Sequence, residues 1–120
     1  MNKKILLVDD NEDQLFLTQL ILVRAGYEVL TSLSGLMALD IFMQRKSEIF
    51  IVVLDILMPD TDGRKLAVKI KAIDPDIPVI LFSQYGYKGK STEWGVEGID
   101  FVMKNDGNKL ITLIKRYEQQ

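Results

Sequence analysis

The chain has 120 residues, of which 48% are hydrophobic, a length that accommodates one domain with its own core. Its 15 Lys and Arg residues against 17 Asp and Glu, without a basic run, argue against direct nucleic-acid binding, and no apolar run reaches the ~18 residues that membrane insertion requires. The absence of Cys excludes disulfides and thiolate sites, which fits a reducing cytoplasm, and the absence of His removes the commonest general base and metal ligand.

Strands and helices alternate in the first half of the chain. Residues 5–8 form a short apolar run that ends on two aspartates, so they indicate a strand rather than a targeting segment. A helix is predicted over 12–25, closed by Gly26, and a strand follows over 27–31. A second helix is predicted over 34–45. This alternation is typical of α/β proteins.

The first helix carries more apolar residues than one buried face requires. Its expected inward stripe consists of Leu17, Leu20, Ile21 and Ala25. A second apolar set widens that stripe and comprises Leu15, Phe16, Leu22 and Val23. Two interpretations stay open: deep packing of the helix against the sheet, or a surface on which a partner docks.

The central strand is predicted over Ile49–Leu54, an apolar run without polar alternation. Such a run is typical of a strand buried on both faces in the middle of a parallel sheet. It ends on Asp55, after which Pro59 and the pair Asp62-Gly63 indicate a turn and a helix start. We therefore expect Asp55 at the carboxyl end of a central strand, where open α/β sheets place their functional residues.

The second half of the chain supplies the remaining elements. A helix over 63–73 should bury one apolar face and leave its basic residues, Lys71 among them, in solvent. Strands are predicted over 79–82 and 99–103, and a final helix begins near residue 107.

The stretch 86–98 interrupts this pattern, because four of the eight glycines of the chain fall within it. Any helix between residues 90 and 94 should therefore be short and weakly formed. With that helix included, five strands alternate with five helices. This order predicts a doubly wound parallel sheet covered on both faces, with right-handed crossovers.

Polar residues directly follow four of the predicted strands: Asp9 and Asp10, Asp55, Ser83, and Lys104. In a doubly wound sheet these strand ends share one edge, so we expect the side chains to converge. Crowded carboxylates repel one another, and oxygen ligands without His or Cys favour Mg²⁺. A carboxylate is a nucleophile toward phosphorus, while a Lys and a hydroxyl would neutralise and hydrogen-bond a transferred phosphoryl group. The pattern predicts Mg²⁺-dependent phosphorylation of Asp55, since the other two aspartates precede a helix start.

Each residue of this set also has an ordinary structural interpretation. Asp10 or Asn11 would N-cap the first helix, Ser83 would be a turn hydroxyl, and Lys104 would be a surface cation. Their joint occurrence at the ends of four strands favours the functional interpretation.

Four motifs stand in order along the whole chain. They are Leu7-Val8-Asp9-Asp10, Leu54-Asp55-Ile56-Leu57-Met58-Pro59 with Asp62-Gly63, Pro78-Val79-Ile80-Leu81-Phe82-Ser83, and Gly98-Ile99-Asp100-Phe101-Val102-Met103-Lys104. Through them the chain resembles the receiver domains of two-component response regulators. The resemblance implies a flavodoxin-like sheet of order 2-1-3-4-5 with five helices, and a single receiver domain over 1–120 with no output domain. It also implies a cytoplasmic phosphorelay protein that supports only its own phosphorylation and autodephosphorylation, not an enzyme.

The resemblance further implies how a phosphoryl group is received. Asp55 would accept it from the phosphohistidine of a sensor histidine kinase or a histidine phosphotransfer protein. Asp10, Asp55 and the backbone carbonyl of Leu57 would bind Mg²⁺, and Asp9 would contact the ion through water.

The resemblance also implies a conformational switch. Lys104 would pair with the phosphoryl oxygens, Ser83 would move to hydrogen-bond the phosphoryl group, and Phe101 would change rotamer to fill the vacated space. This motion would reshape the face formed by the fourth helix, the fifth strand and the fifth helix, where a downstream protein partner would bind.

The chain departs from the family pattern at three places. Asn105 follows Lys104 where Pro is usual, so either a cis peptide there costs ~2.5–4 kcal/mol or Lys104 stands on a trans loop. Gln84 replaces the usual small residue after the switch hydroxyl. Leu57 and Tyr85 flank the site with apolar and aromatic groups, which predicts slow hydrolysis of the acyl phosphate.

Two other classes of function stand beside the phosphoacceptor. A degenerate receiver would fold alike and bind partners without phosphorylation, and the departures at Gln84 and Asn105 leave room for it. An aspartyl-phosphate phosphatase would need an acidic residue two places after the nucleophile, where this chain has Leu57, so we set that class aside.

Overall fold

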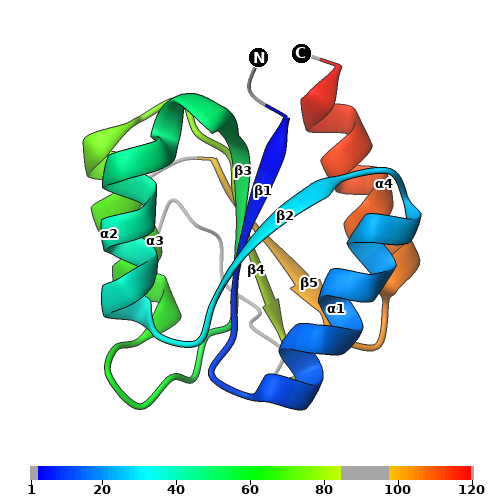
Figure 1. Ribbon diagram of the computed structural model, residues 1–120, viewed down its shortest axis with the longest axis horizontal. Helices are drawn as coiled ribbons and strands as arrows, with labels where there is room; N and C mark the ends of the chain where they lie inside the picture. Colours follow the sequence, from blue (N-terminus) through cyan, green and yellow to red (C-terminus); the bar gives the residue numbers. More distant parts are fainter. Residues whose placement is uncertain (1–2, 85–97, 120) are drawn as a thin grey trace.

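The computed structural model describes residues 3–84 and 98–119, which form one parallel sheet with helices on both faces (Figure 1). The strands are β1 (Lys4–Val8), β2 (Glu28–Ser32), β3 (Ile49–Leu54), β4 (Val79–Ser83) and β5 (Ile99–Met103). The helices are α1 (Glu12–Arg24), α2 (Gly35–Arg45), α3 (Gly63–Ile73) and α4 (Gly107–Glu118), with a 3-10 turn, η1 (Lys46–Glu48), before β3. The order β2-β1-β3-β4-β5 confirms the predicted topology. Four α-helices lie within the described residues, and the helix expected between 90 and 94 lies outside them.

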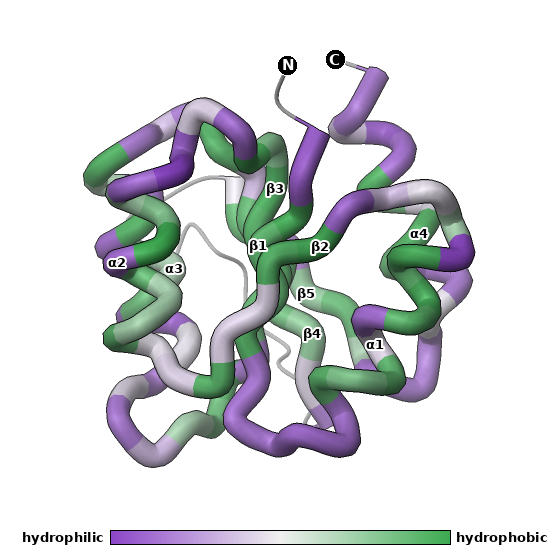
Figure 2. The backbone as a smooth tube through the Cα atoms, viewed as in Figure 1, coloured by the Kyte–Doolittle hydropathy of each residue, from purple (hydrophilic) through white to green (hydrophobic). Residues whose placement is uncertain are grey.

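The sheet separates two hydrophobic clusters, one beneath α2 and α3 and the other beneath α1 and α4 (Figure 1). β4 is buried along its whole length, and β3 is buried at every position except Phe50. Figure 2 shows hydrophobic strands in the middle of the molecule and a hydrophilic segment where β1 leads into α1. Burial on both faces explains why these strands have no polar alternation in the sequence.

Each α-helix in the described residues begins with a side-chain cap. Asn11, Ser34, Asp62 and Asp106 accept hydrogen bonds from backbone N–H groups two or three positions ahead, at 2.8–3.1 Å. Such a cap contributes ~1 kcal/mol to a helix start. Because each helix follows a strand, these starts lie at the carboxyl edge of the sheet. None of these helices is both long enough and apolar enough to span a membrane.

The inward face of α1 differs from the predicted one. Leu15, Thr18 and Leu22 are buried, whereas Leu17 and Ile21 from the predicted stripe are 52% and 40% exposed. Apolar residues surround most of this helix, so periodicity alone does not select the face that packs on the sheet. The outward apolar residues therefore lie on the surface of the protein.

The prediction that Lys71 is solvated was also wrong. Its side chain is buried, with 6% exposed, and its ammonium donates a hydrogen bond to the Ile77 carbonyl at 2.8 Å. Burial lowers the pKa of Lys71, while the carboxylates of Asp74, Asp76 and Asp100 act in the opposite direction. The turn after α3 thus supplies an acceptor that the helical pattern does not reveal.

Candidate functional site

Four strand ends bring the predicted site residues to one edge of the sheet. Val8 pairs with Leu54, so Asp9 and Asp55 follow neighbouring strands, and the Asp55 N–H donates to the Val8 carbonyl at 3.0 Å. On the other side, the Lys104 N–H donates to the Ser83 carbonyl at 2.9 Å. The parallel register therefore places a lysine opposite a group of carboxylates.

The Lys104 ammonium contacts two of those carboxylates. Its Nζ lies 2.6 Å from Asp9 Oδ2 and 3.4 Å from Asp55 Oδ2, and only 9% of its side chain is exposed. All peptide bonds among the described residues are trans, including the one between Lys104 and Asn105. The lysine therefore reaches the carboxylates from a trans loop, which is one of the two arrangements expected for a chain without Pro at 105.

Asp55 is partly buried at the end of the central strand. Its Oδ1 accepts a hydrogen bond from the Ile56 N–H at 2.8 Å, and 13% of its side chain is exposed. Burial raises the pKa of the Asp55 carboxyl, the Lys104 ammonium lowers it, and the negative charge of Asp9 raises it. The net shift of the pKa is upward, because burial and Asp9 disfavour the ionised carboxylate more than Lys104 and the hydrogen bond from Ile56 favour it.

The acidic residues at this edge are suited to a divalent cation. Asp9, Asp10 and Asp55 each offer a carboxylate oxygen, and these oxygens lie within 4.8 Å of one another. A cavity of about 230 Å³ opens beside them. An oxygen-only donor set with space for water matches the preference of Mg²⁺. The residues present therefore fit a hard cation.

The other predicted residues lie around the same cavity or behind it. Ser83 is buried and Leu57 is 56% exposed, and both line the cavity together with Gln84. Phe101 is half-buried and packs against the cluster beneath α2 and α3. Tyr85 lies outside the described residues.

Two contributors to the site were not predicted as such. The Asn11 N–H donates to Asp9 Oδ1 at 3.0 Å, so the residue that caps α1 also holds the carboxylate beside it. In the sequence Gly63 indicates a helix start and belongs to a family motif, but neither pattern reveals that a Cβ there would lie 1.9 Å from the Asp55 carbonyl oxygen. No local pattern reveals this approach, because it depends on how α3 packs on the end of β3.

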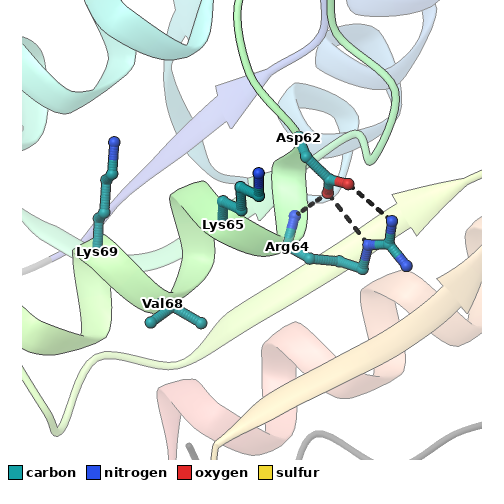
Figure 3. A pocket seen from close by; sticks show the side chains of 5 residues that line it. All are labelled: Asp62, Arg64, Lys65, Val68 and Lys69. Atoms are coloured by element: carbon teal, nitrogen blue, oxygen red, sulfur yellow. Dashed lines mark hydrogen bonds and ion pairs between the residues drawn. The ribbon is translucent and has the colours of Figure 1, made fainter. Parts of the chain in front are cut away.

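The start of α3 is held by an ion pair within one turn. Asp62 accepts hydrogen bonds from the backbone N–H, Nε and Nη2 of Arg64 at 2.8, 3.1 and 2.7 Å (Figure 3). A hollow of about 490 Å³ runs along the same helix past Lys65, Val68 and Lys69 (Figure 3). None of the carboxylates of the acidic group lines it. The predicted residues Asp10, Asp55, Ser83 and Lys104 line the smaller cavity, not this hollow.

Curated relatives are similar in sequence to most of this chain. Sporulation initiation phosphotransferase F of Bacillus subtilis (strain 168) is 36% identical over 86 residues, which are 72% of this chain and 68% of that protein. A two-component response regulator of Oryza sativa subsp. japonica is 40% identical over 102 residues, which are 84% of this chain but 17% of that protein. The chain thus corresponds to a small part of the longer relative.

Solved structures of receiver domains have the same fold as this chain. A response regulator receiver domain protein from Clostridium thermocellum superposes with a TM-score of 0.87 at 29% identity, covering 96% of this chain and 93% of that one. The response regulator TrrA from Thermotoga maritima, in complex with Mg²⁺ and BeF, has a TM-score of 0.82 at 29% identity, covering 96% and 98%. Residues 5–115 match the family described as response regulator receiver domain. The chain therefore belongs to the receiver domains of two-component response regulators.

Proposed function

We propose that Asp55 accepts a phosphoryl group from a phosphohistidine in an Mg²⁺-dependent reaction, and that phosphorylation changes the surface this protein offers to a partner. The observation that carries the proposal is the placement of one partly buried carboxylate beside a lysine and two further aspartates. The same edge of the sheet also holds a hydroxyl, Ser83. Each group has a defined use in phosphoryl transfer.

The transfer step moves one phosphoryl group between two side chains. A carboxylate oxygen of Asp55 forms a bond to phosphorus while the bond from phosphorus to the donor histidine nitrogen breaks. The electron pair of the broken bond stays on that nitrogen, which takes a proton from solvent. The product is an acyl phosphate on Asp55 and a neutral histidine on the donor.

The surrounding side chains would stabilise the charge that this step places on the phosphoryl oxygens. Asp10, Asp55 and the Leu57 carbonyl would hold Mg²⁺, and Asp9 would contact it through water. The bound ion would screen the negative charge of the donor phosphoryl group as it approaches Asp55. Lys104 already lies 3.4 Å from Asp55 Oδ2 and would form a charge-assisted hydrogen bond to a phosphoryl oxygen.

The donor would dock on α1. Phe16, Leu17 and Ile21 on this helix are 64%, 52% and 40% exposed. Leu17 and Ile21 line a groove of about 260 Å³ that Lys104 also lines, so it reaches the edge of the phosphorylation site. A sensor histidine kinase or phosphotransfer protein that covers this apolar surface would bring its phosphohistidine to Asp55. A docking surface, one of the two interpretations of the α1 pattern, would account for the outward residues.

The output would come from Ser83 and Phe101. Movement of Ser83 toward the phosphoryl group would leave space near β4 that the Phe101 ring on β5 would fill. This change would alter the surface that includes β5 and α4, the fifth strand and the last helix of the chain. The fourth helix of the expected partner-binding face falls outside the described residues, so the proposal rests here on β5 and α4.

Acetyl phosphate is a small donor that tests the proposal without a kinase. Intact mass should increase by one phosphoryl group only when Mg²⁺ is present, and Asp55→Ala should abolish the increase. Asp76→Ala serves as the control, because it removes an exposed carboxylate that takes no part in the site. No mass increase in the wild type would favour the degenerate receiver, and an increase in Asp55→Ala would place the acceptor elsewhere. The decay of the mass increase also measures autodephosphorylation.

A further inference from the structure

The loop between β3 and α3, residues 55–62, is closed at its base by backbone hydrogen bonds. The Gly63 N–H donates to the Ile56 carbonyl at 2.7 Å. One step further into the loop, Leu57 and Asp62 form an antiparallel bridge. The side chain of Leu57 is 56% exposed, so it does not hold its own peptide in place by packing. The backbone bridge with Asp62 and the contacts of neighbouring loop residues must therefore determine where the Leu57 carbonyl points.

The tip of this loop is bonded to a different helix. Asp60 Oδ1 accepts a hydrogen bond from the Gly35 N–H at 3.2 Å, and Asp60 Oδ2 accepts one from the Leu36 N–H at 2.9 Å. These are the first two residues of α2, and their amides have no partner within the helix. Figure 1 shows the loop after β3 running past the start of α2. The Asp60 carboxylate thus joins the loop to residues 24 and 25 positions earlier in the sequence.

A second contact joins the same two segments independently of charge. Gly35 is buried, and a Cβ there would lie 2.2 Å from Thr61 Cγ2. The methyl group of Thr61 therefore occupies the space that a side chain at the start of α2 would need. Asp60 and Thr61 together place the tip of the loop on α2.

We infer that Asp60 is a positioning residue for the cation site, holding the loop on α2 so that the Leu57 carbonyl stays directed at the site. The inference rests on the proposed function, in which that carbonyl is a ligand of Mg²⁺. Asp60 stands three positions after Leu57, with Pro59 restricting the backbone between them. Loss of the contact with α2 removes the support at the tip of the loop, so that the carbonyl depends on the bridge with Asp62 and the hydrogen bond at the base of the loop. Residues that orient a ligand from outside contribute ~10–100-fold to metal affinity in other proteins.

The coupling also runs in the opposite direction. A cation that binds better to the ordered loop must stabilise the ordered loop to the same extent. Addition of Mg²⁺ should therefore slow hydrogen exchange of the Gly35 and Leu36 amides, although neither residue lies in the acidic group.

Calorimetric titration with MgCl₂ alone tests the inference, because it gives the dissociation constant of Mg²⁺. Each variant is titrated at a temperature where circular dichroism shows that it is folded. Asp60→Ala should raise the constant about tenfold. Asp60→Asn should raise it less, because the amide keeps one acceptor oxygen. Asp40→Ala removes the same charge from the exposed face of α2 and should leave the constant within about twofold of the wild type, given screening by salt. Equal constants for Asp60→Ala and the wild type, or an equal rise in Asp40→Ala, would overturn the inference.

A pair of variants at the second contact gives a test that does not change charge. Gly35→Ala should displace the Thr61 methyl and weaken Mg²⁺ binding, and addition of Thr61→Ser should restore it. The Ser hydroxyl can keep the 3.4 Å contact of Thr61 Oγ1 with the Asp62 carbonyl. If the wild type shows no Mg²⁺ binding that depends on Asp55, the proposed function fails and the inference with it. If such binding is present but insensitive to Asp60 and to Gly35, only the positioning role fails.

Discussion

Replacement of Gly63 by Ala should displace the backbone that carries Asp55. Gly63 is the first residue of α3, and its N–H donates to the Ile56 carbonyl at 2.7 Å. The new methyl group would lie 1.9 Å from the Asp55 carbonyl oxygen and 2.8 Å from the Ile56 Cα, whereas ordinary van der Waals contact needs 3.4–4 Å. Both neighbours are backbone atoms, so no side-chain rotation relieves the clash. The start of α3 or the Asp55 peptide must shift by more than an ångström.

The expected loss of stability has three parts. Overpacking of a closely packed site costs ~1–3 kcal/mol, and weakening of the hydrogen bond to Ile56 adds ~1 kcal/mol. The higher helix propensity of Ala offsets less than ~1 kcal/mol at a first-turn position. We expect the free energy of unfolding to fall by roughly 1–4 kcal/mol. Urea titration should show a lower midpoint with an unchanged slope, and phosphorylation by acetyl phosphate should slow in the folded variant.

Gly107→Ala is the matched control for this experiment. Gly107 is the first residue of α4 and follows an aspartate cap, as Gly63 does, but its Cβ would lie 3.6 Å from Ile21 Cδ1, an ordinary contact. This variant should be neutral or more stable by up to ~1 kcal/mol. Equal urea midpoints for the two variants would refute the reasoning, because the position in the helix would then explain both.

Three further variants test charge and access at other positions. Lys104→Met leaves the buried Asp9 carboxylate without its cation, so it should lower the melting temperature by an amount equivalent to ~3–5 kcal/mol. MgCl₂ should restore more stability to this variant than to the wild type, and an equal response to MgCl₂ would contradict this. Burial lowers the pKa of Lys71, so in the folded wild type its ammonium loses a proton below the ordinary value of ~10.4. The stability of the wild type relative to Lys71→Met should therefore rise as urea titrations move from pH 7 toward pH 10. A stability difference that stays constant with pH would rule this out. Leu57→Asn places an amide at the cavity that can orient water, so the acyl phosphate should decay about tenfold faster, equivalent to ~1.4 kcal/mol; an unchanged lifetime would show that Leu57 does not slow hydrolysis.

The strand ends could be predicted from the sequence because the relevant chemistry is local there. The run 49–54 has no polar residue until Asp55, and the structure ends β3 at Leu54. Pro and capping residues similarly mark the helix starts, so the predicted bounds of 63–73 agree with those of α3. A parallel sheet then brings the strand ends to one edge without any further information from the sequence.

Faces and tertiary contacts could not be predicted in the same way. Leu17 and Leu22 are both apolar, so which of them faces inward depends on how α1 packs against β1, β2 and α4. Lys71 can be buried because a carbonyl of the following turn accepts a hydrogen bond from its ammonium, and Asp60 accepts hydrogen bonds from α2 because the sheet register brings the two together. The periodicity of a helix or strand carries no information about these tertiary contacts. The sequence therefore predicts the elements and their ends, but not the contacts between elements.

The charges at the site lead us to expect that Lys104 would change partner on the proposed phosphorylation of Asp55. Three carboxylates and one ammonium leave two uncompensated negative charges beside the cavity, which a divalent cation would balance. Conversion of the Asp55 carboxylate to an acyl phosphate adds negative charge to that balanced site. Lys104 is the cation among the described residues that already contacts Asp55, yet it lies closer to Asp9, at 2.6 Å against 3.4 Å. We therefore expect its ammonium to move from Asp9 toward the phosphoryl group. Because Lys104 directly follows β5, that movement would act on the strand that carries Phe101.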